Sequence, residues 1–125
     1  MAVVHWTRAW RCATMMAFST SAECYVPDFN NFAAFYPYYL SEHSHRICRR
    51  WHFIGSTLVL AITLFAVVTR QWGWLWLLPL AGYGCAWIGH YVYQKNRPAT
   101  FTHPLYSLCG DWVMYGQMLR GKLRF

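Results

Sequence analysis

The fold is decided by residues 51–94, which form two stretches without charge, WHFIGSTLVLAITLFAVVT (51–69) and QWGWLWLLPLAGYGCAWIGHYVYQ (71–94), separated only by Arg70. At a rise of about 1.5 Å per residue, either stretch as a helix covers roughly the 30 Å hydrocarbon core of a bilayer. If the chain reverses near Arg70, His52 and His90 reach nearly the same depth, because they stand eighteen residues before it and twenty after it. Ionisable groups at membrane depth are rare, and by default they suggest a functional site.

The composition of the chain also indicates a membrane protein. Of its 125 residues, 57% are hydrophobic and 20% are aromatic, which is more than a soluble domain needs. The net charge of +7 does not indicate a nucleic-acid partner, because the basic residues gather at the outer ends of the two stretches: Arg46, Arg49, Arg50, Lys95 and Arg97. The positive-inside rule places those ends, and both histidines, on the cytoplasmic side. We expect an integral membrane protein of a bacterial inner membrane or of the endoplasmic reticulum.

We therefore predict an all-α fold, a small integral membrane protein built on a transmembrane helix hairpin with spans at about 47–69 and 74–93. Flanking segments at Asp28–Ser41 and after Pro98 are predicted to be interfacial, amphipathic or re-entrant helices. Residues 1–26 are a tail without an assigned function, ahead of a single membrane domain.

Small residues and prolines refine the expected hairpin. Gly55 in the first span, and Gly82, Gly84 and Gly89 in the second, are expected to allow close helix packing. Pro79 predicts a kink in the second span. The five cysteines include no CxxC pair, so neither a disulfide framework nor a structural zinc site is implied.

Three histidines can converge at the basic end of the hairpin. His43 and His52 are nine residues apart, so one unbroken helix would put them on opposite faces, whereas a break at 44–46 would let both approach His90. Three imidazoles with open coordination positions suit iron, zinc or copper. A lone histidine here would more simply be an interfacial, hydrogen-bonded side chain, but the shared depth favours a joint site. His45 and His103 are further candidates.

Polar neighbours of these histidines suggest supporting roles. Gln94 follows His90 by four residues and so shares its helix face. Arg50 and Arg97 stand at the same rim, where they would set the topology and could also bind the acid head group of a lipid. Asp111 is the only acid after Glu42, and we expect it to cap a helix or pair with a basic residue.

Two blocks of the sequence also resemble a known family. FYPYYLSEHSHRICRRWHFIGS (35–56) and AWIGHYVYQKNRPATFTHPLYSLCGDWVMY (86–115) closely resemble the signature blocks of the Mpo-like membrane proteins, in which an HxxxxxxxxH block pairs with a GHxxxxKxRPA block. The resemblance covers nearly everything from Phe29 onward. It makes 27–125 an Mpo-like membrane domain.

The resemblance implies an enzyme. The best-studied members of the family are iron(II)-dependent dioxygenases that shorten 2-hydroxy fatty acids by one carbon during sphingoid-base breakdown. It implies that His43, His52 and His90 are the iron(II) ligands and catalytic residues. The partners would be a 2-hydroxy fatty acid, dioxygen and membrane lipids. Where many relatives have glutamate after the last ligand histidine, this chain has Gln94, which makes it either a second-sphere residue or a weakened ligand.

Two other functions remain open at this point. The chain could be a non-catalytic membrane scaffold or lipid-binding protein whose histidines sit at the headgroups. Alternatively, the chain could be an electron carrier in which His52 and His90 are the axial ligands of a haem held between two helices.

Overall fold

The described part of the chain, residues 28–125 of a computed structural model, consists of helices joined by short turns and contains no strand. The predicted tail, 1–26, lies outside the described residues. The elements are α2 (Phe32–Glu42), α3 (Arg46–Thr69), the 3₁₀-helix η1 (Trp72–Leu77), α4 (Leu78–Trp87), the π-helix η2 (Ile88–Gln94), the 3₁₀-helix η3 (Ala99–Phe101) and α5 (Pro104–Leu119). The all-α prediction is confirmed over these residues.

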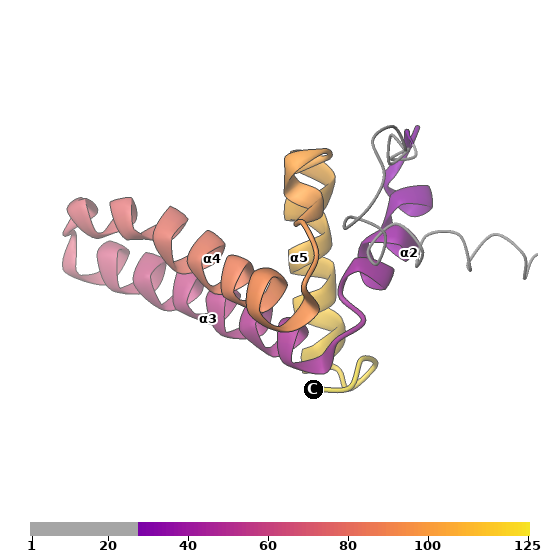
Figure 1. The fold of residues 1–125 in the computed structure, drawn as a ribbon. Coiled ribbons are helices and arrows are strands. Elements are labelled where there is room, and N and C mark those ends of the chain that lie inside the picture. The colour runs from indigo at the N-terminus through magenta and orange to yellow at the C-terminus, as the bar shows by residue number, and fades with distance from the viewer. Residues whose placement is uncertain (1–27) are drawn as a thin grey trace, which may run out of the picture.

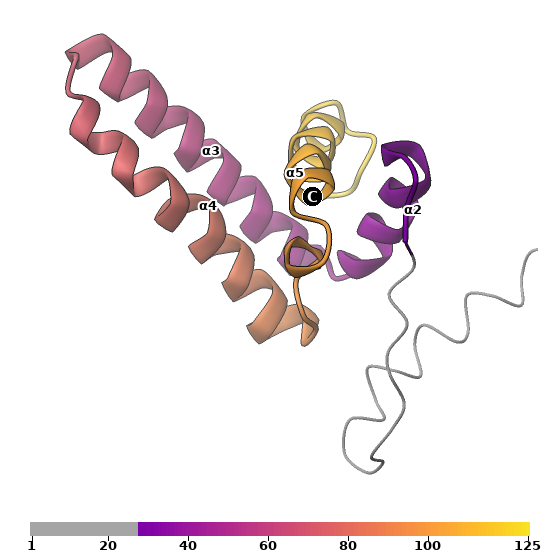
Figure 2. The ribbon, with the colours of Figure 1, turned by 90° about the horizontal axis from the view of Figure 1, so that it is seen from above.

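A long helix hairpin is the main feature of the fold. Helix α3 ends where Arg70 takes a left-handed conformation (φ 55°) and its N–H bonds back to the carbonyls of Ala66 and Val67. The chain then returns through η1, α4 and η2, and both views show α4 running antiparallel to α3 along its length (Figures 1 and 2). The reversal at Arg70 brings the two ends of the hairpin together, as the sequence predicted.

Small residues set the distance between the two limbs. A Cβ added to Gly55 would lie 2.9 Å from the Cβ of Cys85, and one added to Gly89 would lie 3.2 Å from the backbone oxygen of Cys48. Gly82 faces Val59, whereas the nearest neighbour of Gly84 is Leu80 of its own helix. The limbs therefore touch backbone to backbone at Gly55 and Gly89, and Gly84 does not belong to the predicted packing face.

The second limb differs from the single kinked span that we predicted at 74–93. The second limb changes from 3₁₀ to α to π geometry. Pro79 lies in the first turn of α4, where its missing N–H breaks no helical bond, so it starts this helix and does not kink it. Among the described residues only α3 is by itself long and apolar enough to cross a membrane. The hairpin is thus present, but its second limb is not a continuous membrane-length α-helix.

The helix break expected between His43 and His52 is present. Asn31 caps α2 by accepting a bond from the N–H of Ala34, and the helix continues through Pro37 to Glu42. After a short loop, the His45 side chain caps α3 by accepting from the N–H of Ile47. The predicted helix at 28–41 therefore exists but is shifted toward the C-terminus, to Phe32–Glu42.

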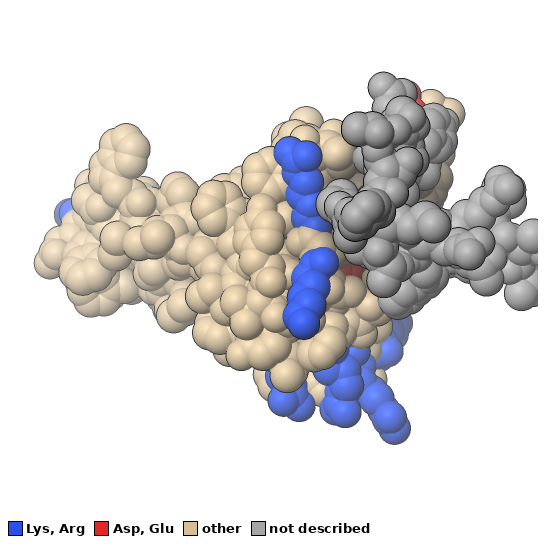
Figure 3. All heavy atoms as spheres, in the orientation of Figure 1, with Lys and Arg blue, Asp and Glu red and all other residues tan. Residues whose placement is uncertain are grey.

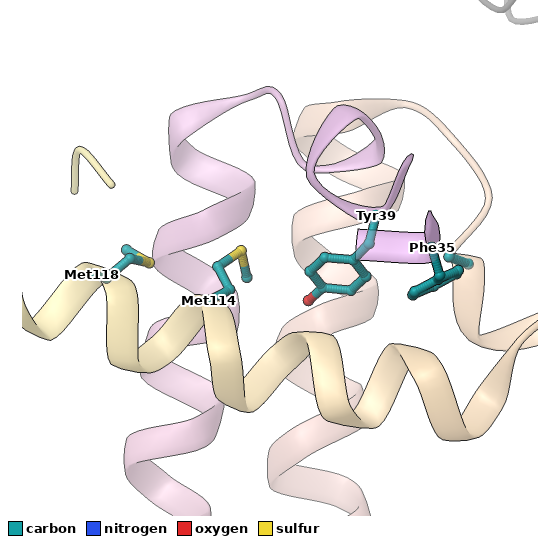
Figure 4. Packing of buried hydrophobic residues seen from close by; sticks show 5 residues of the cluster. Phe35, Tyr39, Met114 and Met118 are labelled. Atoms are coloured by element: carbon teal, nitrogen blue, oxygen red, sulfur yellow. The ribbon is translucent and has the colours of Figure 1, made fainter. Parts of the chain in front are cut away.

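Helix α5 crosses the hairpin near its open end and packs against α2. The contact is a small core of Phe35, Tyr39, Met114 and Met118, with Ala99 beside them (Figure 4). A Cβ on Gly110 would come within 2.9 Å of the Tyr39 ring, so α5 can approach α2 only because a glycine is there. The helix that we predicted after Pro98 is therefore present as α5, and it packs against both α2 and α3.

Charge is distributed unevenly over the surface. The hairpin arm is almost free of charge in Figure 3, and the lysines and arginines gather around the end where α2, α3 and α5 meet. Large apolar side chains of the arm face outward, with Leu64, Val68, Trp76 and Leu80 between 64% and 86% exposed. A membrane-inserted hairpin requires this distribution, with an apolar arm and basic residues gathered at one end.

We expect Gly55→Ala to destabilise the protein by about 1–3 kcal/mol, because the added methyl group overpacks the backbone contact between α3 and α4. Thermal unfolding in detergent measures the loss. Gly84→Ala is the matched control and should leave the melting temperature unchanged or raise it, since alanine is the better helix former and no neighbour is closer than 4.0 Å. Equal stability of both variants would contradict the proposed packing.

Candidate metal centre

Three histidine side chains from three different elements meet in the interior at the basic end of the hairpin. His43 comes from the α2–α3 loop, His52 from α3 and His90 from η2, and their side chains are 1%, 7% and 1% exposed. The ring centroid of His43 lies 4.4 Å from that of His52 and 4.5 Å from that of His90. The ring centroids of His52 and His90 are 5.1 Å apart. The structure therefore brings together the three histidines that the sequence singled out.

Each imidazole has a hydrogen-bond acceptor on its outer side. The Nδ1 atom of His43 lies 2.7 Å from the backbone oxygen of Tyr39, that of His52 lies 2.9 Å from Oδ1 of Asp111, and that of His90 lies 2.8 Å from Oδ1 of Asn96. The amide group of Asn96 is oriented by its Nδ2 atom, which donates to Glu42. Because all three partners accept, each Nδ1 carries a proton, and in a neutral ring this leaves the lone pair on Nε2.

The free lone pairs point toward one another. The Nε2 atoms of His43 and His52 are 3.1 Å apart. If both rings are neutral and carry their proton on Nδ1, both Nε2 atoms are acceptors, and no proton lies between them. Two metal–nitrogen bonds of about 2.1 Å at roughly a right angle would separate their nitrogens by about 3.0 Å. Outer acceptors that fix the tautomer of ligating histidines are the usual arrangement around protein-bound metals. The residues present therefore fit a divalent transition-metal ion.

The protonation state of His43 suits a ligand. Burial, followed by the neighbouring rings of His52 and His90, lowers the pKa of His43 well below its ordinary value. The ring is consequently neutral at physiological pH, and metal binding requires no loss of a proton from it.

Cys48 lies close to the three imidazoles but does not face the cavity that opens beside them. Its sulfur and the three histidine nitrogens form a buried group whose ligand atoms all lie within 4.8 Å of one another. Cys48 packs against Gly89, and it does not line the cavity described below.

Asp111 joins three elements at this centre. One carboxylate oxygen accepts from His52 Nδ1 on α3 and from the hydroxyl of Tyr39 on α2, while Asp111 itself belongs to α5. Burial and the nearby Asp111 raise the pKa of Tyr39 well above its ordinary value, which keeps the phenol protonated as a donor. The Tyr39 ring also stacks on His43 at 4.1 Å. Of the two roles that we expected for Asp111, it has that of a partner for a basic residue, His52, and it does not cap a helix because it lies inside α5.

The loop that carries His43 is held from two sides. Gln94 accepts from the backbone N–H of His45 and donates to the Ser44 hydroxyl, both at 2.7 Å. Arg49 donates to the carbonyls of His43 and Ser44 at 2.9 and 2.8 Å. Gln94 therefore acts on the cluster through the loop, and its bonds go to Ser44 and His45 instead of to a ligand imidazole.

An apolar cavity of about 260 Å³ opens beside the imidazoles. Its polar end is formed by His43, His52, His90 and Asp111. From there the lining follows one face of α3 through Ser56 and Val59, and one face of the second limb from Trp87 back to Pro79 and Leu78. The cavity combines a cluster of donor nitrogens with an apolar groove.

Four other predicted site residues lie elsewhere. Arg50 reaches the backbone oxygen of Phe125 at 3.4 Å and lies over its ring, and Arg97 lies over the ring of Phe101. His103 packs among Phe29, Phe35 and Tyr106, and His45 caps α3. None of the four lines the cavity, so the structure does not bring the two arginines to the histidine cluster's cavity.

The packing of the three rings does not favour the haem alternative. A haem held by His52 and His90 would need its macrocycle between them, and His43 contacts both rings there. The cluster is suited to a single ion.

Comparison with known proteins agrees with this geometry. The profile of a family described as "2-hydroxy-palmitic acid dioxygenase Mpo1-like" matches residues 29–123. The chain belongs to this family. The match covers every element that contributes a residue to the histidine cluster and its hydrogen-bond partners, from α2 to α5. No curated protein and no solved structure matches the chain.

We expect Asp111→Asn to weaken metal binding about tenfold or more, since it removes the charged acceptor that orients His52. Titration of cobalt(II) or anaerobic iron(II) into the detergent-purified protein measures the affinity. Asp28→Asn, the same chemical change at an exposed position, is the control and should leave affinity unchanged. An unaltered affinity in Asp111→Asn would show that His52 does not bind the ion through this arrangement.

Proposed function

We propose that this protein is an iron(II)-dependent membrane dioxygenase that shortens 2-hydroxy fatty acids by one carbon. The observation that carries the proposal is the position of the imidazole cluster, because three histidine side chains that could donate nitrogen ligands line an apolar cavity together. The description of the family supports the substrate class and the reaction. When bound, iron(II) would supply the dioxygen chemistry that amino-acid side chains lack.

Iron fits both the ligands and the reaction class, and the dioxygenase description of the family favours it. Imidazole nitrogens suit iron, copper, nickel and zinc alike, so the ligand set alone does not choose among them. Zinc has no redox chemistry. The oxygenation of a fatty acid requires redox chemistry, so zinc does not suit the reaction. His43, His52 and His90 would hold the ion on one side, and the cavity side would stay open for the substrate.

The length of the cavity suits a long acyl chain. Along the second limb its lining runs from His90 to Leu78, and twelve residues at 1.5 Å each give about 18 Å. The hydrocarbon core of a bilayer is about 30 Å thick and holds two layers of acyl chains, so one chain reaches roughly 15 Å. The apolar walls would bind the chain and keep water from the polar end.

The membrane is the expected source of such a substrate. We propose that the hairpin arm inserts into the bilayer with the basic end, and the imidazole cluster, on the cytoplasmic side. The uncharged arm and the lysines and arginines at its base support this orientation (Figure 3). A fatty acid could then enter the cavity from the lipid phase without crossing water.

Alanine at His43, His52 or His90 is expected to abolish both iron binding and oxygen consumption with 2-hydroxypalmitate, because each substitution removes one of three ligands. His45→Ala and His103→Ala are the controls and should keep most of both, since neither side chain reaches the cluster. Metal analysis and an oxygen electrode provide the two readings. If the wild-type protein binds no transition metal, the protein is a non-catalytic lipid-binding or scaffold protein and the proposal is wrong.

A further inference from the structure

One hydroxyl in the wall of the cavity has no partner. Ser107 of α5 lines the cavity and is 2% exposed, and its Oγ is buried without a hydrogen bond. Nearly all buried polar groups are paired, because leaving one unpaired destabilises the protein. A side chain of this kind beside a cavity suggests a bond that forms only when the cavity is filled.

The helix itself offers Ser107 a bond that it does not make. The hydroxyls of Thr57, Thr63 and Thr69 each donate to the carbonyl one turn earlier, at 2.7–2.8 Å. The equivalent carbonyl for Ser107 is that of His103, which accepts only from the Ser107 backbone N–H. The Ser107 hydroxyl is therefore turned away from the usual local acceptor.

Ser107 lies on the same helix face as a residue of the metal centre. It precedes Asp111 by four residues, one helical turn, and Asp111 accepts the hydrogen bond from His52. Both side chains line the cavity together with the three histidines. The residue with the unpaired hydroxyl is thus one helical turn from the carboxylate that holds His52.

The polar end lacks a cationic side chain. No lysine or arginine among the described residues lines the cavity, and Arg50 and Arg97 lie over phenylalanine rings elsewhere. Asp111 contributes a negative charge to the same wall. Burying a carboxylate without hydrogen-bond donors is costly, so an acid that enters here needs donors from the wall in addition to the bound ion.

We propose that Ser107 is a substrate-binding residue whose hydroxyl donates a hydrogen bond to the carboxylate of the bound fatty acid. The inference rests on the proposed function. It assigns to Ser107 the role that the sequence suggested for Arg50 and Arg97. A hydrogen bond to a charged group contributes about 1.5–3 kcal/mol, which corresponds to roughly a tenfold to hundredfold change in affinity.

Calorimetric titration of the anaerobic iron(II)-loaded protein in detergent tests the assignment with two ligands. Ser107→Ala and Ser107→Cys should both bind 2-hydroxypalmitate roughly tenfold to a hundredfold more weakly than the wild type, because cysteine keeps the volume but is a poor donor. Their affinity for hexadecane-1,2-diol, which has no carboxylate, should match that of the wild type. Ser41→Ala is the control, since the Ser41 hydroxyl already bonds to the Tyr38 carbonyl.

Thermal unfolding without ligand separates binding from a structural role. Removing an unpaired buried hydroxyl should leave the melting temperature of Ser107→Ala equal to or higher than that of the wild type. A marked loss of stability in both variants, unchanged affinity for 2-hydroxypalmitate, or wild-type affinity in Ser107→Cys would each overturn the assignment. If the wild type itself binds neither 2-hydroxypalmitate nor the diol, the proposed function fails as a whole.

Discussion

Three imidazoles packed against one another need an acceptor for each outer N–H, and most of the structure around the open end of the hairpin meets that need. The acceptors are the Tyr39 carbonyl, the Asp111 carboxylate and the Asn96 amide. They come from α2, from α5 and from the turn after η2. If an acceptor were missing, its ring could change tautomer and turn its lone pair away from the centre.

The same requirement explains why the helices outside the hairpin are fixed where they are. Asp111 reaches His52 because α5 crosses the hairpin, and α5 comes close enough to α2 because Gly110 leaves room for the Tyr39 ring. The Tyr39 hydroxyl then shares the Asp111 carboxylate. Loss of one of these contacts would disturb the others, since one carboxylate serves both bonds.

Periodicity and spacing were enough to predict the hairpin, the break before α3 and the shared depth of His52 and His90. Each depends on local sequence or on counting residues from one reversal at Arg70. The changes of helical form along the second limb could not be predicted, because Pro79 is compatible with either a kink or a helix start, and nothing in the residues of η2 announces a π-helix. The partner of Asp111 was missed because it depends on how α5 crosses the hairpin, a tertiary contact without a sequence period. Arg50 and Arg97 were predicted at the basic end of the hairpin. Their contacts could not be predicted, because a long side chain can reach several partners there.

X-ray absorption at the iron edge of the anaerobic protein tests most directly whether the three imidazoles hold the ion. The arrangement of His43, His52 and His90 predicts a first shell with three imidazole nitrogens at about 2.1 Å, with the outer-ring scattering that identifies imidazole. A first shell made only of oxygen atoms, without imidazole scattering, would contradict the account.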